Sequence, residues 1–115
     1  MADLKNILTK VLKEKLDSHE DFLLVNVLSK ESFEFMHIPG SLNADVHQDD
    51  FLEKMEELTG GDKGKEIVVY CSSATCQASP SAARKLAEAG YSNVAHFSEG
   101  LAGWKEAGYE FERAE

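Results

Sequence analysis

The sequence predicts an α/β fold, a doubly wound parallel sheet of four to five strands with helices on both faces. Two nearly continuous apolar runs, residues 22–28 and 67–71, have the composition of strands that are covered on both sides. Segments with apolar residues at three- and four-residue steps alternate with such runs. Strands that alternate with helices form parallel sheets with right-handed crossovers, and this order of elements therefore indicates the doubly wound architecture.

The size and charge of the chain restrict its function. Its 115 residues fit one domain, residues 1–115, whose residues 1–20 are predicted to form an amphipathic helix and a linker. The formal charge of −9 opposes binding to nucleic acid or to an anionic membrane. No apolar run is long enough to span a bilayer, and residues 1–10 lack the core of a secretory signal, which predicts a cytoplasmic location.

The first half of the chain predicts two helices and two strands. Apolar residues at helical spacing predict a helix over 4–16, and the apolar run 22–28 predicts a buried strand. Ser29 is the expected N-cap of a short helix, which the His-Ile-Pro-Gly segment at 37–40 ends. A short strand is expected over 41–44.

The second half continues the alternation. A helical stripe over 51–58 ends at Gly60, and a strand rich in β-branched residues follows over 67–71. Ser79 is the expected N-cap of a helix that runs to about residue 89. The remaining predicted elements are a strand over 94–97 and a helix over 101–107.

Cys71 is the leading candidate for chemistry because it is the last residue of a predicted central strand, and ligands of parallel sheets bind beyond the carboxyl ends of the strands. The loop that follows is small and polar, so its N–H groups can turn inward, bind an anion and lower the pKa of a cysteine. The residues of this predicted substrate-binding loop are Ser72, Ser73, Ala74, Thr75, Cys76, Gln77, Ala78 and Ser79.

Both cysteines also have simpler interpretations. Cys71 can be a small buried apolar residue, and Cys76 can merely fill a small pocket. The functional hypothesis for Cys76 is a resolving thiol that attacks an oxidised or persulfidated Cys71. The two cysteines and a histidine give a weak zinc signal, because no second ligand pair accompanies their spacing, so neither a metal nor another cofactor is expected.

Five segments of this chain resemble the rhodanese family of sulfurtransferase domains, and the main match covers residues 21–110. They are the strand 22–28, the segment 34–43 with His-Ile-Pro-Gly, the strand 67–71, the helix and turn at 79–91, and the glycine-tryptophan segment at 100–109. The resemblance implies that Cys71 carries sulfane sulfur as a persulfide and that the loop amides bind the transferred sulfur. It also implies structural roles for His37 and Trp104.

The chain departs from the family pattern near the predicted site. Asn26 and Leu28 stand where the family usually has an aspartate and an arginine, and Met36 replaces a residue that is often glycine. The loop is about two residues longer than the common sulfurtransferase loop and contains no lysine or arginine, which disfavours phosphatase or arsenate chemistry. Thiosulfate, a dianion, is a less favoured donor than a polysulfide or a protein persulfide.

The sequence therefore predicts a rhodanese-type sulfurtransferase that carries sulfur on Cys71. Its expected partners are a small sulfur donor, or a protein persulfide, and a thiol acceptor. Two alternatives remain at this stage. One is a thiol redox or sensor domain that uses Cys71 and Cys76, and the other is a non-catalytic rhodanese-like binding module.

Overall fold

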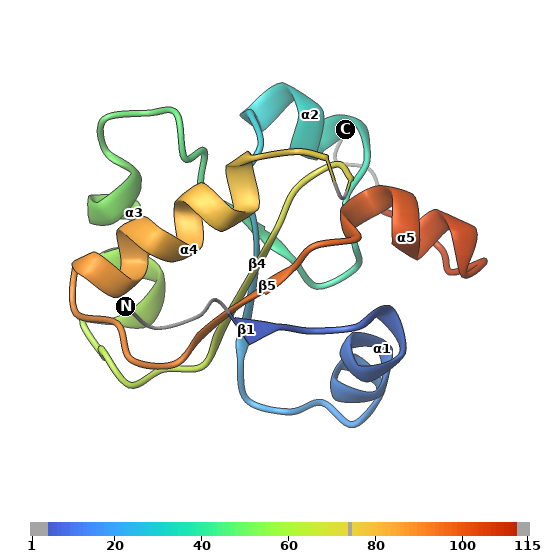
Figure 1. The fold of residues 1–115 in the computed structure, drawn as a ribbon, viewed down its shortest axis with the longest axis horizontal. Coiled ribbons are helices and arrows are strands. Elements are labelled where there is room, and N and C mark those ends of the chain that lie inside the picture. Colours follow the sequence, from blue (N-terminus) through green and yellow to red (C-terminus); the bar gives the residue numbers. More distant parts are fainter. Residues whose placement is uncertain (1–4, 74, 113–115) are drawn as a thin grey trace.

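Five parallel strands form one sheet in the computed structural model, which describes residues 5–73 and 75–112 (Figure 1). The strands are β1 (Lys5–Asn6), β2 (Leu23–Asn26), β3 (Leu42–Asn43), β4 (Ile67–Tyr70) and β5 (Val94–Phe97). Their order across the sheet is β1-β5-β4-β2-β3, which places β4 at the centre. Every pairing between these strands is parallel, as the alternation of elements predicts.

Helices cover both faces of the sheet, which confirms the doubly wound prediction. The helices are α1 (Thr9–Asp17), α2 (Lys30–Phe35), α3 (Phe51–Thr59), α4 (Ala78–Glu88) and α5 (Gly100–Glu106). Figure 1 shows α3 and α4 on one side of the sheet and α1 and α5 on the other. Among residues 5–73 and 75–112, no helix combines the length and the apolar content that a membrane crossing requires.

The central strand β4 supplies side chains to two separate cores. Ile67 and Val69 pack in the core beneath α3 and α4, whereas Val68 and Tyr70 pack in the core beneath α1 and α5. This division follows from the strand geometry, because successive side chains point to opposite faces. All four side chains are fully buried, as the continuous apolar run predicts.

The N-terminal segment differs from its prediction. The helix expected over 4–16 begins only at Thr9, and Lys5–Asn6 form β1 at the edge of the sheet next to β5. The N–H group of Ile7 extends this pairing by donating to the carbonyl of His96 over 3.0 Å. Ile7 fits a helical pattern in the sequence, but its backbone joins the sheet because the side chain is then buried in the core with α1. Leu4 lies outside the described residues.

Tyr70 of the central strand binds the His-Ile-Pro-Gly turn by hydrogen bonds. The Tyr70 hydroxyl accepts a hydrogen bond from the N–H group of Ile38 over 3.0 Å and lies 2.8 Å from the hydroxyl of Ser41. Since Ser41 donates its own proton to the Ile38 carbonyl, Tyr70 is the donor toward Ser41. Burial raises the pKa of Tyr70 and keeps the phenol neutral. The turn and the strand that leads to Cys71 are thus held in one arrangement.

Candidate active site

Cys71 follows β4 directly, at the carboxyl end of the central strand, where the sequence predicts it. Its side chain packs in the core beneath α3 and α4, and the residue is only 1% exposed. The thiol donates a weak hydrogen bond to the backbone carbonyl of Cys76, with 3.7 Å between the sulfur and the oxygen. Both cysteines are free thiols. The loop therefore folds back over Cys71 and brings the second cysteine to it.

The start of the loop is anchored on α5. The N–H group of Leu101 donates to the Cys71 carbonyl over 3.0 Å, and that of Ala102 donates to the Ser72 carbonyl over 2.9 Å. Gly100 permits this approach, because it has a φ of +60° and a Cβ atom there would lie 2.4 Å from the Cys71 carbonyl oxygen. The glycine of the predicted glycine-tryptophan segment therefore holds the loop in place.

The structure corrects the sequence prediction for the pKa of Cys71. Burial is the largest effect and raises the pKa of the thiol, and the hydrogen bond with the Cys76 side chain raises it further. Hydrogen bonds from the hydroxyl and N–H groups of Ser79 act in the opposite direction and are outweighed. The prediction of a lowered pKa assumes that the N–H groups of the loop surround the Cys71 sulfur. In the structure the Cys71 side chain instead packs in an apolar core.

Ser79 also has a different place from the predicted one. The helix α4 begins at Ala78 with Gln77 as its N-cap, so Ser79 lies inside the first turn and is 1% exposed. Its side chain faces Cys71 instead of capping the helix. The prediction of Ser79 as the N-cap is wrong because the N-cap is Gln77, two residues earlier in the chain.

The Cys76 side chain receives the hydrogen bonds from the loop that the sequence predicts for Cys71. It is half-buried, in a turn closed by its own N–H group, which donates to the Ser73 carbonyl over 3.1 Å. Partial burial raises the pKa of Cys76, but a hydrogen bond from the Cys71 thiol opposes this effect. Hydrogen bonds from the N–H groups of Ala78 and Ser72 and from the Ser72 hydroxyl also lower the pKa. Together these hydrogen bonds outweigh burial, and the pKa of Cys76 is lowered.

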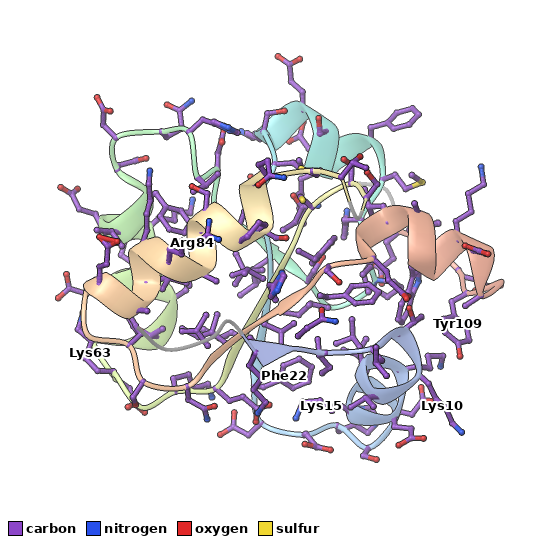
Figure 2. The ribbon with its side chains drawn as sticks, in the orientation of Figure 1. Lys10, Lys15, Phe22, Lys63, Arg84 and Tyr109 are labelled. Carbon is purple, nitrogen blue, oxygen red and sulfur yellow. The ribbon has the colours of Figure 1, made fainter. Side chains whose placement is uncertain are left out.

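No cationic side chain of the loop contributes to this site. Residues 72–79 contain neither lysine nor arginine. Arg84 lies further along α4, as Figure 2 shows, and the neighbouring Lys85 donates to the Val46 carbonyl over 3.3 Å. Negative charge on a sulfur atom in the loop is therefore stabilised by N–H, O–H and S–H groups rather than by a fixed positive charge.

A cavity of about 370 Å³ adjoins the start of the loop. Its apolar lining comes from Leu28, from Phe35 and Met36 at the end of α2, and from Leu101 on α5, and Ser72 forms the side next to the loop. Leu28 and Met36 are two of the positions at which the sequence departs from the rhodanese pattern. These departures thus make the wall beside the loop apolar.

A family model described as the rhodanese-like domain matches residues 8–107. The chain belongs to the rhodanese-like domain family. The matched region contains the β4 strand, the Cys71 loop and helices α4 and α5, so the site described above lies within the rhodanese-like domain.

Individual relatives of this rhodanese-like domain differ in length. The "HTH-type transcriptional regulator Rv0324" of Mycobacterium tuberculosis is 34% identical over 85 residues, which cover 74% of this chain and 35% of that protein. The "Putative sulfurtransferase YtwF" of Bacillus subtilis is 32% identical over 103 residues, which cover 90% of this chain and 92% of that protein. This chain thus spans about a third of the first relative and nearly all of the second.

Solved structures show the same fold. The crystal structure of a thiosulfate sulfurtransferase from Pseudomonas aeruginosa superposes with a TM-score of 0.84 and 21% sequence identity. The likeness covers 97% of this chain and 21% of that one. At this identity the superposition shows the fold alone.

The position of the family's usual aspartate is filled by a neutral hydrogen-bonding side chain. Asn26 is 0% exposed, donates from its amide group to the Tyr70 hydroxyl over 3.3 Å and accepts from the N–H group of Leu28 over 2.9 Å. A neutral amide satisfies these partners without a counter-ion. The missing charged pair is therefore replaced by a hydrogen-bonded and apolar arrangement.

The other residues singled out in the sequence lie in structural contacts. The His37 ring is stacked on Phe33 with 4.0 Å between the ring centres, and its Nδ1 atom donates to the Phe33 carbonyl over 2.8 Å. Trp104 is buried and donates from Nε1 to the Glu110 carbonyl over 2.8 Å. In the part of the chain that the structure describes, no three acidic, cysteine or histidine side chains gather as metal ligands would.

Sequence reasoning missed the N–H donors of Leu101 and Ala102. These residues belong to a segment that the resemblance identifies, but their backbone role follows only from the fold. The available signal was Gly100, since a glycine between a strand and a helix often marks a close backbone approach.

Proposed function

We propose that this rhodanese-like domain is a sulfurtransferase that carries sulfane sulfur as a persulfide on Cys71. The observation that carries the proposal is the position of Cys71 at the carboxyl end of the central strand, beneath a loop that supplies N–H, O–H and thiol groups. The name of YtwF, which matches nearly the whole chain, supports the same class of reaction.

The loading step needs a base, because Cys71 is the thiol with the raised pKa. Cys76 supplies that base, since its lowered pKa favours the thiolate and it already accepts a hydrogen bond from the Cys71 thiol. As the Cys71 sulfur attacks the outer sulfur of a donor persulfide, its proton passes to Cys76 and the donor leaves as a thiolate. An external thiol acceptor then takes the outer sulfur from the Cys71 persulfide.

The surroundings of the loop favour a donor that is neutral or singly charged. Thiosulfate is a dianion, and the loop offers no lysine or arginine to compensate it on a chain of charge −9. The apolar cavity beside Ser72 instead fits the carbon chain of a persulfide. A polysulfide or a protein persulfide is therefore the proposed donor, and nucleic acid and membranes are not proposed partners.

A second candidate function is a thiol redox or sensor domain. The observation that favours it is the direct interaction between the thiols of Cys71 and Cys76. The match to a third of a mycobacterial transcriptional regulator is consistent with a sensing role for domains of this kind. In this function the two thiols are oxidised to a disulfide without receiving sulfur.

Intact-protein mass spectrometry tests the first proposal. The reduced chain is incubated with polysulfide or with thiosulfate, beside the variants Cys71→Ser and Cys76→Ser. Ser92→Ala is the matched control, because Ser92 lies in the turn before β5, at the opposite end of the strands from Cys71.

The expected result is sulfur uptake from polysulfide that is absent in Cys71→Ser and present in Cys76→Ser. The second variant still loads, but more slowly, because water replaces Cys76 as the base while the loss of the hydrogen bond from Cys71 to Cys76 removes one cause of the raised Cys71 pKa. Thiosulfate should load the chain less than polysulfide does. Oxidation of the native chain without any Cys71-dependent sulfur uptake would replace sulfur transfer by the redox function.

A further inference from the structure

The sulfur of Cys76 is held by groups that a transferred sulfur on Cys71 would also need. The N–H groups of Ser72 and Ala78 and the Ser72 hydroxyl are hydrogen-bonded to the Cys76 side chain. The rhodanese resemblance assigns the loop amides to the outer sulfur of the Cys71 persulfide. A persulfide on Cys71 must therefore compete with Cys76 for the same donors.

The two cysteines are also held together by the fold. The Cys71 thiol donates to the Cys76 carbonyl over 3.7 Å, and Cys76 packs against the core cluster that contains Cys71. The turn from Ser73 to Cys76, closed by a backbone hydrogen bond of 3.1 Å, directs the chain back toward Cys71. A nucleophile placed next to the sulfur that it attacks gains a large advantage over an external thiol.

We propose that Cys76 is an internal acceptor, which attacks the Cys71 sulfur of the persulfide, forms the Cys71–Cys76 disulfide and expels hydrosulfide. This inference rests on the proposed function, because it requires the Cys71 persulfide. The new bond joins the two cysteine sulfurs, and the bond between Cys71 and the outer sulfur breaks. Cys76 first gives the proton that it accepted during loading to water and attacks as the thiolate. The outer sulfur then leaves as HS⁻ with the electron pair of the broken bond, while the two cysteine sulfurs become a disulfide.

The product is therefore hydrosulfide, and a further partner is needed for turnover. The disulfide must be reduced by an external dithiol, which regenerates both thiols and is itself oxidised. The difference in exposure between the two cysteines determines which sulfur the reductant attacks. Cys71 is 1% exposed whereas Cys76 is half-buried, so the reductant attacks the Cys76 sulfur and Cys71 leaves as the thiolate. The chain then acts between a reaction that generates persulfides and a dithiol reductant.

A single-turnover experiment tests this inference with the full chain. The protein is reduced, freed of reductant and mixed under anaerobic conditions with glutathione persulfide, the sulfur donor used as the probe. Hydrosulfide is trapped with monobromobimane, and the protein is followed by intact mass spectrometry. The same measurements are made on Cys71→Ser, Cys76→Ser and the control Ser92→Ala.

The native chain and Ser92→Ala should release hydrosulfide once and become lighter by two hydrogens, and added dithiothreitol should restart release. Cys76→Ser should keep its persulfide and release hydrosulfide at least about tenfold more slowly, because the internal thiol is gone. The Cys71→Ser variant should take up no sulfur.

Three results would overturn the inference. Stable persulfide on the native chain, without a disulfide, would refute the internal acceptor and leave the proposed sulfurtransferase intact. Equal release from Cys76→Ser would do the same, since hydrosulfide would then come from another route. Absence of sulfur from both the native chain and Cys76→Ser would refute the proposed function together with the inference.

Discussion

Gly100 lies so close to Cys71 that a Cβ atom on the glycine would be 2.4 Å from the Cys71 carbonyl oxygen. This contact allows the first turn of α5 to donate two backbone hydrogen bonds to Cys71 and Ser72. The carboxyl end of β4 and the N-terminal end of α5 are thereby joined at the start of the loop that follows Cys71. The geometry of the loop depends on this approach of two backbones.

Gly100→Ala is expected to destabilise the protein and to displace the loop. The left-handed backbone alone costs a non-glycine residue about 1 to 3 kcal/mol, and the contact with Cys71 adds to this loss. Urea denaturation measures the free energy of unfolding. The control is Gly108→Ala, since Gly108 has a φ of +84° but no atom within 4 Å of its Cβ position. Equal losses in the two variants would show that the close approach has no importance.

Alkylation is expected to distinguish the two cysteines. Cys76 has the lowered pKa and the greater exposure, so iodoacetamide should modify it before Cys71 at neutral pH. The thiolate fraction rises as the pH rises through the pKa, and the Cys76 reaction should therefore persist to lower pH than that of an ordinary cysteine. Peptide mapping after short exposures measures both rates. Faster modification of Cys71 in the folded chain would contradict the assignment of the thiolate to Cys76.

The sheet could be predicted largely from the sequence because its strands carry a strong apolar signal. The strand predicted over 94–97 has the same bounds as β5, and β4 lies within the predicted run 67–71. Strand β1 could not be predicted, since Lys5–Asn6 has no apolar pattern and is defined only by its pairing with β5. A two-residue edge strand depends on its partner rather than on its own sequence.

Asn26→Asp is expected to lower the free energy of unfolding by about 3 to 5 kcal/mol near neutral pH, because it buries a charge whose hydrogen-bond partners include no cation. The loss should shrink in acid, where the carboxyl group is neutral. Urea denaturation at two pH values measures both effects. The double variant with Leu28→Arg should recover part of the stability by supplying a counter-ion.

The control for this substitution is Asn93→Asp, because Asn93 is exposed and its replacement leaves the new charge in water. That variant should change the free energy of unfolding by less than about 0.5 kcal/mol. If Asn26→Asp changes the free energy of unfolding as little as Asn93→Asp does, the buried position of Asn26 does not require a neutral side chain.

The position of Cys71 at the carboxyl end of a central strand was predictable, but the hydrogen bonds within the loop that follows were not. Cys71 could be located because parallel sheets gather ligands at the carboxyl ends of their strands. Which sulfur receives the N–H groups depends on the direction of each peptide plane, and small polar residues permit many directions. The sequence therefore assigns the lowered pKa to Cys71, whereas the fold gives it to Cys76.

His96 is expected to make stability depend on pH. Burial, and then the positive charge of Arg84, lower the pKa of His96, so the folded state binds fewer protons than the unfolded state. The free energy of unfolding should therefore fall as the pH drops through the ordinary histidine pKa of about 6.5. Urea denaturation at about pH 7.5 and about pH 5.5 measures the difference.

His96→Gln should reduce this dependence, and Arg84→Gln should raise the His96 pKa in an NMR titration. The matched control is His47→Gln, which removes an exposed histidine instead of the half-buried His96. An unchanged slope in His96→Gln would assign the pH effect to other groups.

The loop after β4 is bound to the rest of the fold at two points, at its start and at Cys76. The carbonyls of Cys71 and Ser72 accept hydrogen bonds from α5, and the carbonyl of Cys76 accepts one from the Cys71 thiol over 3.7 Å. The segment between these two points can therefore change in length or gain a second thiol while the sheet and the helices stay the same, so that one fold can acquire different reactivities.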